Sequence, residues 1–420
     1  MGTILPMDLF PDTAAVEIGH LSVAGIPAST LAEEHGTPLL VLCEATIRAR
    51  ARAYREAAPD ALVVYGTKAF PNVSVMRLLA EEGLGADVST LGELRFAQRA
   101  GIAGEALVVH GNNKDDAELA EAAAAGALVV LDAPDEVERA AAAGVRRTLV
   151  RLTLGVEAET HEAIRTGQHG SKFGLPPEQA LEVIERAQPL GLHVHIGSQL
   201  LDGGAARLTV DRLAAFAAEC RDRLGWTPEV VDLGGGLGVR TSPDEPAPPS
   251  IADFVHELLA QLRSAWATHD LPPPQLILEP GRSIVSPAGV TLYRVGAVKH
   301  VNESGAWVAV DGGMSDNPRP QLYGARYTAL LANRANEPLT GAYRIAGKHC
   351  ESGDVLIDRV ELPEPRRGDL LAVPATGAYT LAMASNYNGV PRPAAVLVAA
   401  GTARVVRRRE TVDDLLALEH

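Results

Sequence analysis

Three short motifs place side chains of chemical interest directly after apolar runs. Lys68 lies in VVYGTKAF, His195 in HVHIGSQ and Glu279 in ILEPGR. A lysine held away from water can form a Schiff base with a carbonyl compound, and lysine is the usual anchor of pyridoxal phosphate. A solvated surface charge is the ordinary alternative for any single lysine. The role of Lys68 therefore depends on the elements around it.

Two glycine-rich turns also follow apolar runs. The segment DLGGGLGV contains Gly234, Gly235 and Gly236, and EPGR contains Gly281 and Arg282. Glycines let backbone N–H groups approach an anion closely, and an arginine adds positive charge. Parallel barrels commonly bind phosphate in the loops after their last two strands. The two turns together indicate a phosphate-bearing ligand, whereas glycines that only make tight turns are the alternative.

From about residue 60 the chain alternates short β-branched or leucine-rich runs with stretches of helical periodicity. Such alternation implies parallel strands joined by crossover helices. Eight repeats match a (β/α)8 barrel better than an open doubly wound sheet. The expected strands are 61–65, 85–88, 106–109, 128–131, 148–152, 192–196, 230–233 and 276–278. The expected helices are 73–82, 91–100, 114–125, 135–143, 177–187, 206–224 and 251–269.

In a barrel of this kind the chemistry collects at the carboxyl ends of the strands. A single polar residue there is often only a helix cap or a turn residue, but a polar residue or glycine after every strand predicts a ligand site. The residues that follow the expected strands are Lys68, Asp87, His110, Asp132, Arg151, His195, Ser198, Gly234 to Gly236, Glu279, Gly281 and Arg282.

After about residue 290 the helical periodicity is mostly replaced by short strands with turns between them. The first 45 residues also look extended, with PLLVL at 38–42 before a helix that begins near Glu44. We therefore expect three parts: an N-terminal segment (1–45) that joins the β domain, a barrel (46–290), and a C-terminal β-sandwich or β-barrel domain (291–420).

The composition limits the function further. The 420 residues carry 53 Asp and Glu against 38 Lys and Arg, a net charge of −15, which disfavours nucleic acid or anionic lipid as a partner. Cys43, Cys220 and Cys350 are too few and too scattered for a disulfide framework or a thiolate metal site, so no metal is expected. With no membrane-length apolar run and no recognisable signal segment, the expected location is the cytoplasm.

A longer set of motifs, in order from about residue 30 to residue 400, resembles the diaminopimelate decarboxylases. The motifs are YGTKAFPN, ADVSTLGEL, HGNNK, HIGSQ, DLGGGLGV, EPGR, DGGM with RPQLYGA, GKHCESGDVL and GAYTLAMASNYNGVPRP. This family has the alanine-racemase-like fold, and the resemblance implies a pyridoxal-phosphate-binding barrel with a C-terminal β domain. Gly66 and Phe70 depart from the commonest form of the lysine motif, Tyr-Ala-x-Lys-Ala-Asn.

The resemblance implies a cofactor role for each barrel motif. Lys68 would hold pyridoxal phosphate covalently, and His195 would stack on its ring. Glu279 would bond the pyridine nitrogen, and a carboxylate there keeps the nitrogen protonated, which favours decarboxylation over racemisation. The remaining cofactor set comprises Asp87, Tyr379 and the phosphate-binding Ser198, Gly235, Gly236, Gly281 and Arg282.

The resemblance also implies that the active site is shared between two subunits. Cys350 in HCESGD matches the family's proton donor, and its polar neighbours argue against the alternative of a small buried hydrophobe. Cys350, Glu351 and Tyr379 would reach the barrel of the other subunit of a homodimer.

Substrate choice follows from the residues expected at the distal end. Arg282, Arg319 and Tyr323 match the family's carboxylate-binding set, and Glu351 would meet the distal ammonium. The implied reaction is decarboxylation of meso-2,6-diaminopimelate to L-lysine, the last step of lysine biosynthesis. The alternatives are a decarboxylase of ornithine, arginine or a carboxynorspermidine-type substrate, and a non-catalytic homologue that binds pyridoxal phosphate.

Overall fold

The computed structural model describes residues 5–155, 171–195, 197, 199–200, 204–301 and 306–419. The chain forms two compact units. The first comprises Met1–Ala49, Val239–Ala247 and Arg282–His420, and the second comprises Arg50–Gly238 and Pro248–Gly281. In the described part of the chain, no helix is both long and apolar enough to cross a bilayer.

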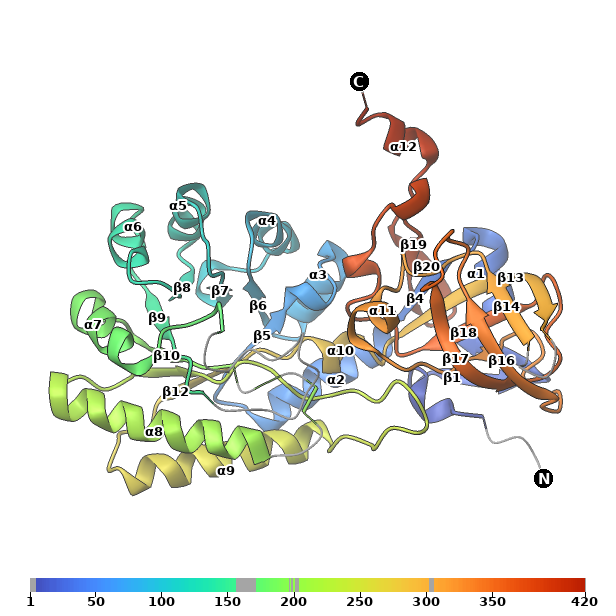
Figure 1. Cartoon of the computed structure of the whole chain (residues 1–420). Helices are drawn as coiled ribbons and strands as arrows, with labels where there is room; N and C mark the ends of the chain where they lie inside the picture. Colours follow the sequence, from blue (N-terminus) through green and yellow to red (C-terminus); the bar gives the residue numbers. More distant parts are fainter. Residues whose placement is uncertain are drawn as a thin grey trace. The chain divides into compact units, whose positions relative to one another are not determined.

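The second unit is a closed barrel of eight parallel strands (Figure 1), and the predicted barrel is therefore confirmed. The order around the barrel is β10-β11-β12-β5-β6-β7-β8-β9. The strands are β5 (Leu62–Gly66), β6 (Gly85–Val88), β7 (Leu107–Val109), β8 (Leu128–Leu131), β9 (Thr148–Arg151), β10 (Gly191–His193), β11 (Val230–Asp232) and β12 (Gln275–Leu278). Buried aliphatic side chains such as Val64, Val108 and Ile277 form one cluster of its core.

Helices connect successive strands and lie on the outside of the barrel (Figure 1). They are α3 (Val73–Glu81), α4 (Leu91–Ala100), α5 (Asp116–Ala125), α6 (Glu136–Ala142), α7 (Pro177–Ala187), α8 (Gly204–Leu224) and α9 (Ile251–Thr268). Helix α5 begins two residues later than predicted, because Asp115 and Glu118 form a capping box. Lys114 is instead buried before the helix, with its Nζ 3.0 Å from Glu136.

The first unit consists mainly of β-sheet. A small antiparallel sheet contains β1 (Ala14–Glu17), β2 (His20–Val23) and β3 (Ile26–Pro27). A nine-stranded sheet contains seven strands in the order β17-β16-β14-β13-β4-β19-β20. The other two strands lie off this path: β18 pairs with β13, and β15 pairs with β18. Its strands are β4 (Leu39–Cys43), β13 (Gly289–His300), β14 (Ala306–Val310), β15 (Leu330–Leu331), β16 (Gly341–Ala346), β17 (Val355–Leu362), β18 (Leu370–Pro374), β19 (Ala394–Ala399) and β20 (Thr402–Arg407).

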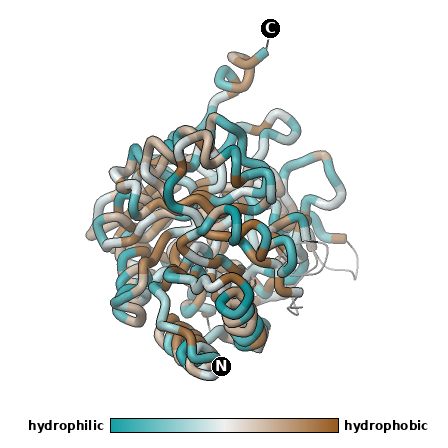
Figure 2. The backbone as a smooth tube through the Cα atoms, turned by 90° about the vertical axis from the view of Figure 1, so that its left-hand side faces the viewer, coloured by the Kyte–Doolittle hydropathy of each residue, from teal (hydrophilic) through white to brown (hydrophobic). Residues whose placement is uncertain are grey.

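Strand β4 explains why the N-terminal segment belongs to the β domain. It pairs antiparallel with β13 and parallel with β19, and its five residues are all buried. The predicted β domain that takes in the N-terminal segment is therefore confirmed. The unit ends in the short helix α12 (Val412–Leu416), whose Val412 and Leu416 are largely exposed. Figure 2 shows hydrophobic as well as hydrophilic stretches in the turns near the C-terminus.

Candidate active site

Lys68 lies directly after β5, at the carboxyl end of the barrel. Its Nζ is 2.8 Å from Oδ2 of Asp87, which is buried on the neighbouring strand β6. Thr67 fixes the turn, because its hydroxyl donates to the backbone oxygen of Asp87 at 2.7 Å. The Lys68 side chain remains 49% exposed, so its amine is both held and accessible to a carbonyl compound.

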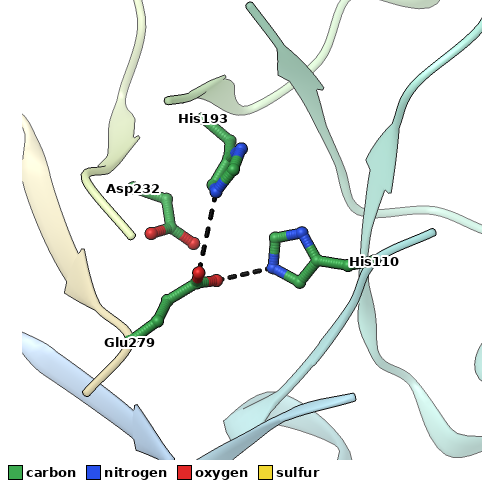
Figure 3. A group of neighbouring side chains, drawn as sticks. All are labelled: His110, His193, Asp232 and Glu279. Atoms are coloured by element: carbon green, nitrogen blue, oxygen red, sulfur yellow. Dashed lines mark hydrogen bonds and ion pairs between the residues drawn. The ribbon is translucent and has the colours of Figure 1, made fainter. Parts of the chain in front are cut away.

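Glu279 follows β12 and lies among three other buried titratable side chains (Figure 3). Its Oε1 is 2.5 Å from Nε2 of His110, and its Oε2 is 3.7 Å from Nε2 of His193. Asp232, at the end of β11, completes the group. All four side chains come from the ends of different strands, as the barrel topology requires.

The charges in this group are set by burial and by mutual contacts. Burial alone would raise the pKa of Glu279, but His110 and then His193 outweigh it and hold this pKa well below its usual range. Burial, followed by the charge of Glu279, raises the pKa of Asp232 well above its ordinary value. Burial lowers the pKa of His193 to about 3. At neutral pH Glu279 is therefore ionised and His193 is neutral, whereas Asp232 is the carboxyl group that gives up its proton less readily.

The same four residues could in principle surround a cation, since their donor atoms lie within 4.8 Å of one another. The hydrogen bond between His110 and Glu279 already uses one nitrogen of His110 and one carboxylate oxygen of Glu279. We therefore interpret the group as support for the Glu279 carboxylate.

The glycine turn after β11 packs against two predicted cofactor residues. A Cβ atom on Gly234 would lie 2.7 Å from Nδ1 of His195, and a Cβ on Gly235 would lie 2.4 Å from the backbone oxygen of Glu279. Gly234 also has φ of +68° and Gly236 has φ of +138°. Only glycine fits this turn, which fixes His195 and Glu279 at the barrel end.

Gly281 is equally restricted, because a Cβ there would lie 2.9 Å from the backbone oxygen of Gly66.

Burial, and then the ammonium of Lys68, lower the pKa of His195 well below its usual value, so its ring is neutral. Ser198, the remaining predicted phosphate ligand, lies outside the described residues.

The barrel residues fit pyridoxal phosphate. An accessible lysine amine, a neutral imidazole and a buried ionised carboxylate are the groups that bind its carbonyl carbon, its ring face and its ring nitrogen. Lys68, His195 and Glu279 supply these three groups in one unit of the structure.

A second group of predicted residues lies in the other unit. The guanidinium carbon of Arg282 is 4.6 Å from the ring centroid of Tyr379. Arg319 is buried at the start of α11 (Arg319–Tyr323) and donates to the hydroxyl of Tyr327 at 3.0 Å. Burial, and then the positive charge of Arg319, lower the pKa of Arg282 to about 10.

These two guanidiniums have nitrogen atoms that no described group satisfies. In the described part of the chain, Nη1 of Arg282 and Nε of Arg319 are buried with no hydrogen-bond partner. Burying guanidinium groups without a counter-charge is costly, and a planar carboxylate matches the guanidinium fork. Tyr323 lies at the end of the same helix and is one of the groups that act on Arg282.

Cys350 and Glu351 form a third group, also in the first unit. Cys350 is exposed, and its backbone N–H donates to Asn388 at 3.0 Å. The Tyr387 hydroxyl donates to Glu351 at 3.4 Å. The neighbouring His349 is buried and bonded to Asp354 through both its backbone N–H and its Nδ1. The loop that presents the thiol therefore rests on a buried pair of hydrogen-bonded side chains.

The sequence missed several residues that the structure places in these groups. His193 and Asp232 fall within the expected apolar strands 192–196 and 230–233. The polar side chain two residues before His195 in HVHIGSQ is a usable signal for the first of them. His110 was noticed only as a strand-end residue. Tyr327, Tyr387 and Asn388 gave no local signal of their role.

The comparisons with known proteins show the family to which the chain belongs. Residues 44–286 match the family described as "Pyridoxal-dependent decarboxylase, pyridoxal binding domain". A diaminopimelate decarboxylase of Actinosynnema pretiosum subsp. auranticum is 46% identical, with 99% of this chain and 96% of that protein covered. The one from Bacillus subtilis (strain 168) is 42% identical, with 96% and 95% covered.

The solved structures show the same relationship. The crystal structure of diaminopimelate decarboxylase from M. jannaschii in complex with L-lysine has a TM-score of 0.90 at 32% identity, with 97% of this chain and 98% of that chain covered. The fold and the barrel site define a pyridoxal-dependent decarboxylase, which uses pyridoxal phosphate as its cofactor. Within that class, the chain belongs to the diaminopimelate decarboxylase family.

Proposed function

We propose that this protein decarboxylates meso-2,6-diaminopimelate to L-lysine and CO2. The observation that supports this choice of substrate is that Nη1 of Arg282 and Nε of Arg319 are buried with no hydrogen-bond partner among the described residues. Diaminopimelate has a distal carboxylate that could bind to these guanidiniums. Ornithine and arginine have no distal carboxylate. Lysine bound to the M. jannaschii relative is the product of the same reaction.

The reaction breaks the bond between Cα and its carboxylate, and Cα gains a proton in place of CO2. When bound, pyridoxal phosphate would supply the sink for the electron pair that remains on Cα. Lys68 would hold the cofactor, His195 would cover its ring, and the ionised Glu279 would keep the ring nitrogen protonated. Asp87 would orient Lys68, while Ser198, Gly235, Gly236 and Gly281 with Arg282 would bind the phosphate.

The proton for Cα would come from Cys350, whose thiol is exposed on a loop held by Asn388. Glu351 would bind the distal ammonium of the substrate, and Arg319 with Tyr323 and Tyr379 would bind the distal end. We infer that Cys350 and Glu351 act in the barrel of the other subunit of a homodimer. Tyr379 stacks on Arg282 of its own chain, so it would act beside that arginine and not, as the resemblance implies, in the partner's barrel. A cytoplasmic location would keep the three free cysteines reduced.

The test is CO2 release by the purified protein with added pyridoxal phosphate. We expect turnover with meso-diaminopimelate and little with lysine, ornithine, arginine or carboxynorspermidine. A protein that binds the cofactor but acts only on ornithine or arginine would support the alternative decarboxylases. Cofactor binding with no turnover of any of these substrates would support a non-catalytic homologue.

A further inference from the structure

A continuous series of side-chain contacts connects Lys68 to Glu279 through Asp87 and His110. Lys68 Nζ is 2.8 Å from Asp87 Oδ2, and Asp87 Oδ1 is 3.7 Å from His110 Nε2. The same His110 nitrogen is 2.5 Å from Glu279 Oε1. His110 thus lies between the carboxylate next to the anchoring lysine and the carboxylate expected at the cofactor's ring nitrogen.

The position of His110 is fixed by the barrel itself. Its backbone N–H donates to Val88 on β6 at 2.8 Å, and its side chain is 7% exposed. Its ring meets that of His193 edge-on, with the centroids 4.7 Å apart. The hydrogen bond to Glu279 joins residues 169 positions apart in sequence. Such a contact holds the end of β12 to the end of β7.

The direction of this hydrogen bond follows from the charge of Glu279. An ionised carboxylate only accepts, so Nε2 of His110 must carry the hydrogen and donate it. A hydrogen-bond donor to the buried carboxylate of Glu279 favours its ionised form. The neighbouring carboxyl group of Asp232 disfavours ionisation of Glu279. Two adjacent buried carboxyl groups do not both ionise readily, and the short hydrogen bond to His110 favours ionisation of Glu279.

We propose that His110 is a positioning residue that keeps Glu279, rather than Asp232, as the ionised and correctly oriented partner of the cofactor's ring nitrogen. This inference rests on the proposed use of pyridoxal phosphate but not on the proposed substrate. In this role His110 acts on the cofactor through Glu279 and does not contact the substrate. A purely structural histidine would need only its volume and its packing against His193.

Two variants separate these roles, because they differ in where they place an N–H group. The amide nitrogen of Gln lies as many bonds from Cβ as Nε2 of histidine does, whereas that of Asn lies where Nδ1 would be. His110→Gln should therefore retain the donor to Glu279, and His110→Asn should lose it. His256→Asn, on the exposed side of α9, is the matched control.

The readouts are the dissociation constant of pyridoxal phosphate and the pH at which the absorbance of the bound cofactor changes, both measured without substrate. Losing a hydrogen bond to a buried charged group costs about tenfold or more in binding. We expect this loss, with a shifted pH midpoint, for His110→Asn but not for His110→Gln or His256→Asn. The titratable groups around His110 that contribute to the midpoint are Lys68, Asp87, Arg151, His193, Asp232 and Glu279.

Equal cofactor affinity and equal spectra for His110→Asn and the wild type would overturn the proposal. So would equal losses in His110→Asn and His110→Gln, since packing alone would then explain them. A stoichiometric metal ion in the purified protein that His110→Asn no longer binds would also overturn it. A wild-type protein that binds pyridoxal phosphate but does not act on diaminopimelate would refute only the proposed substrate.

Discussion

The guanidinium of Arg282 lies over the ring of Tyr379, with 4.6 Å between the guanidinium carbon and the ring centroid. Tyr379 has φ of +57°, a left-handed conformation that is uncommon for a residue with a side chain. An aromatic face stabilises a cation without neutralising it as a carboxylate would. The arrangement therefore holds Arg282 in place and leaves its charge available for an anion.

Replacing Arg319 should reduce recognition of the distal carboxylate. Removing one partner of a buried charge pair costs about 2–5 kcal/mol, so we expect Arg319→Met to lower kcat/KM for meso-diaminopimelate by about 30-fold or more. The absorbance of bound pyridoxal phosphate should not change. The control is Arg344→Met, since Arg344 is 44% exposed and lies over Trp307 in the same unit. A similar loss in both variants would contradict the assignment of Arg319.

Removing the amine of Lys68 should abolish covalent attachment of the cofactor. In Lys68→Ala we expect loss of the absorbance of the attached cofactor and no adduct after borohydride reduction. Mass spectrometry of the reduced wild-type protein should locate the adduct on Lys68. Lys172→Ala is the control, because Lys172 contacts the ring of Phe173. An adduct on Lys172 or Lys348 would show that the assignment to the end of β5 is wrong.

A shared active site predicts recovery of activity in mixed dimers. Lys68→Ala and Cys350→Ala should each be inactive or slow, but a mixed dimer would have one site with both defects and one with neither. Random exchange makes about half of the dimers mixed, so activity should approach roughly a quarter of the wild-type value. Each variant incubated alone under the same conditions is the control. Demonstrated exchange without recovery would place Lys68 and Cys350 in a site within one chain.

The buried Asp316 should make stability depend on pH. Burial raises its pKa to about 7, while the Tyr293 hydroxyl and the Gly313 N–H both donate to its carboxyl group. Between about pH 4 and pH 7 the folded protein keeps a proton that the unfolded chain loses. The free energy of unfolding should therefore fall as pH rises, by up to about 1.4 kcal/mol per pH unit.

Asp316→Asn should remove this contribution, because its amide does not titrate and its oxygen still accepts from Tyr293. Urea unfolding at pH 5, 6, 7 and 8 would measure the difference from the wild type. Asp358→Asn, at a position 80% exposed, should leave the slope unchanged. If the curves of Asp316→Asn and the wild type run parallel, Asp316 does not titrate in this range.

The sequence was sufficient for the barrel and for the residues at its strand ends, because each apolar run was bounded by glycine or polar residues. It was insufficient for the buried side of the site. His193 and Asp232 lie in three-residue strands, which are too short for alternation to show which side chains face inward. The support of Cys350 by Asn388 and of Glu351 by Tyr387 depends on a distant loop, so no local pattern could predict it.

Strand β4 has a consequence for the order of folding during synthesis. Its first partner, β13, begins at Gly289, and the ribosome needs roughly 10 to 50 s to translate from Cys43 to that point. The barrel unit is translated in full by Gly281 and can close during this interval. Meanwhile the five apolar residues LLVLC remain without a strand partner in the nascent chain. We therefore expect this segment to be the part of the emerging protein most in need of a chaperone.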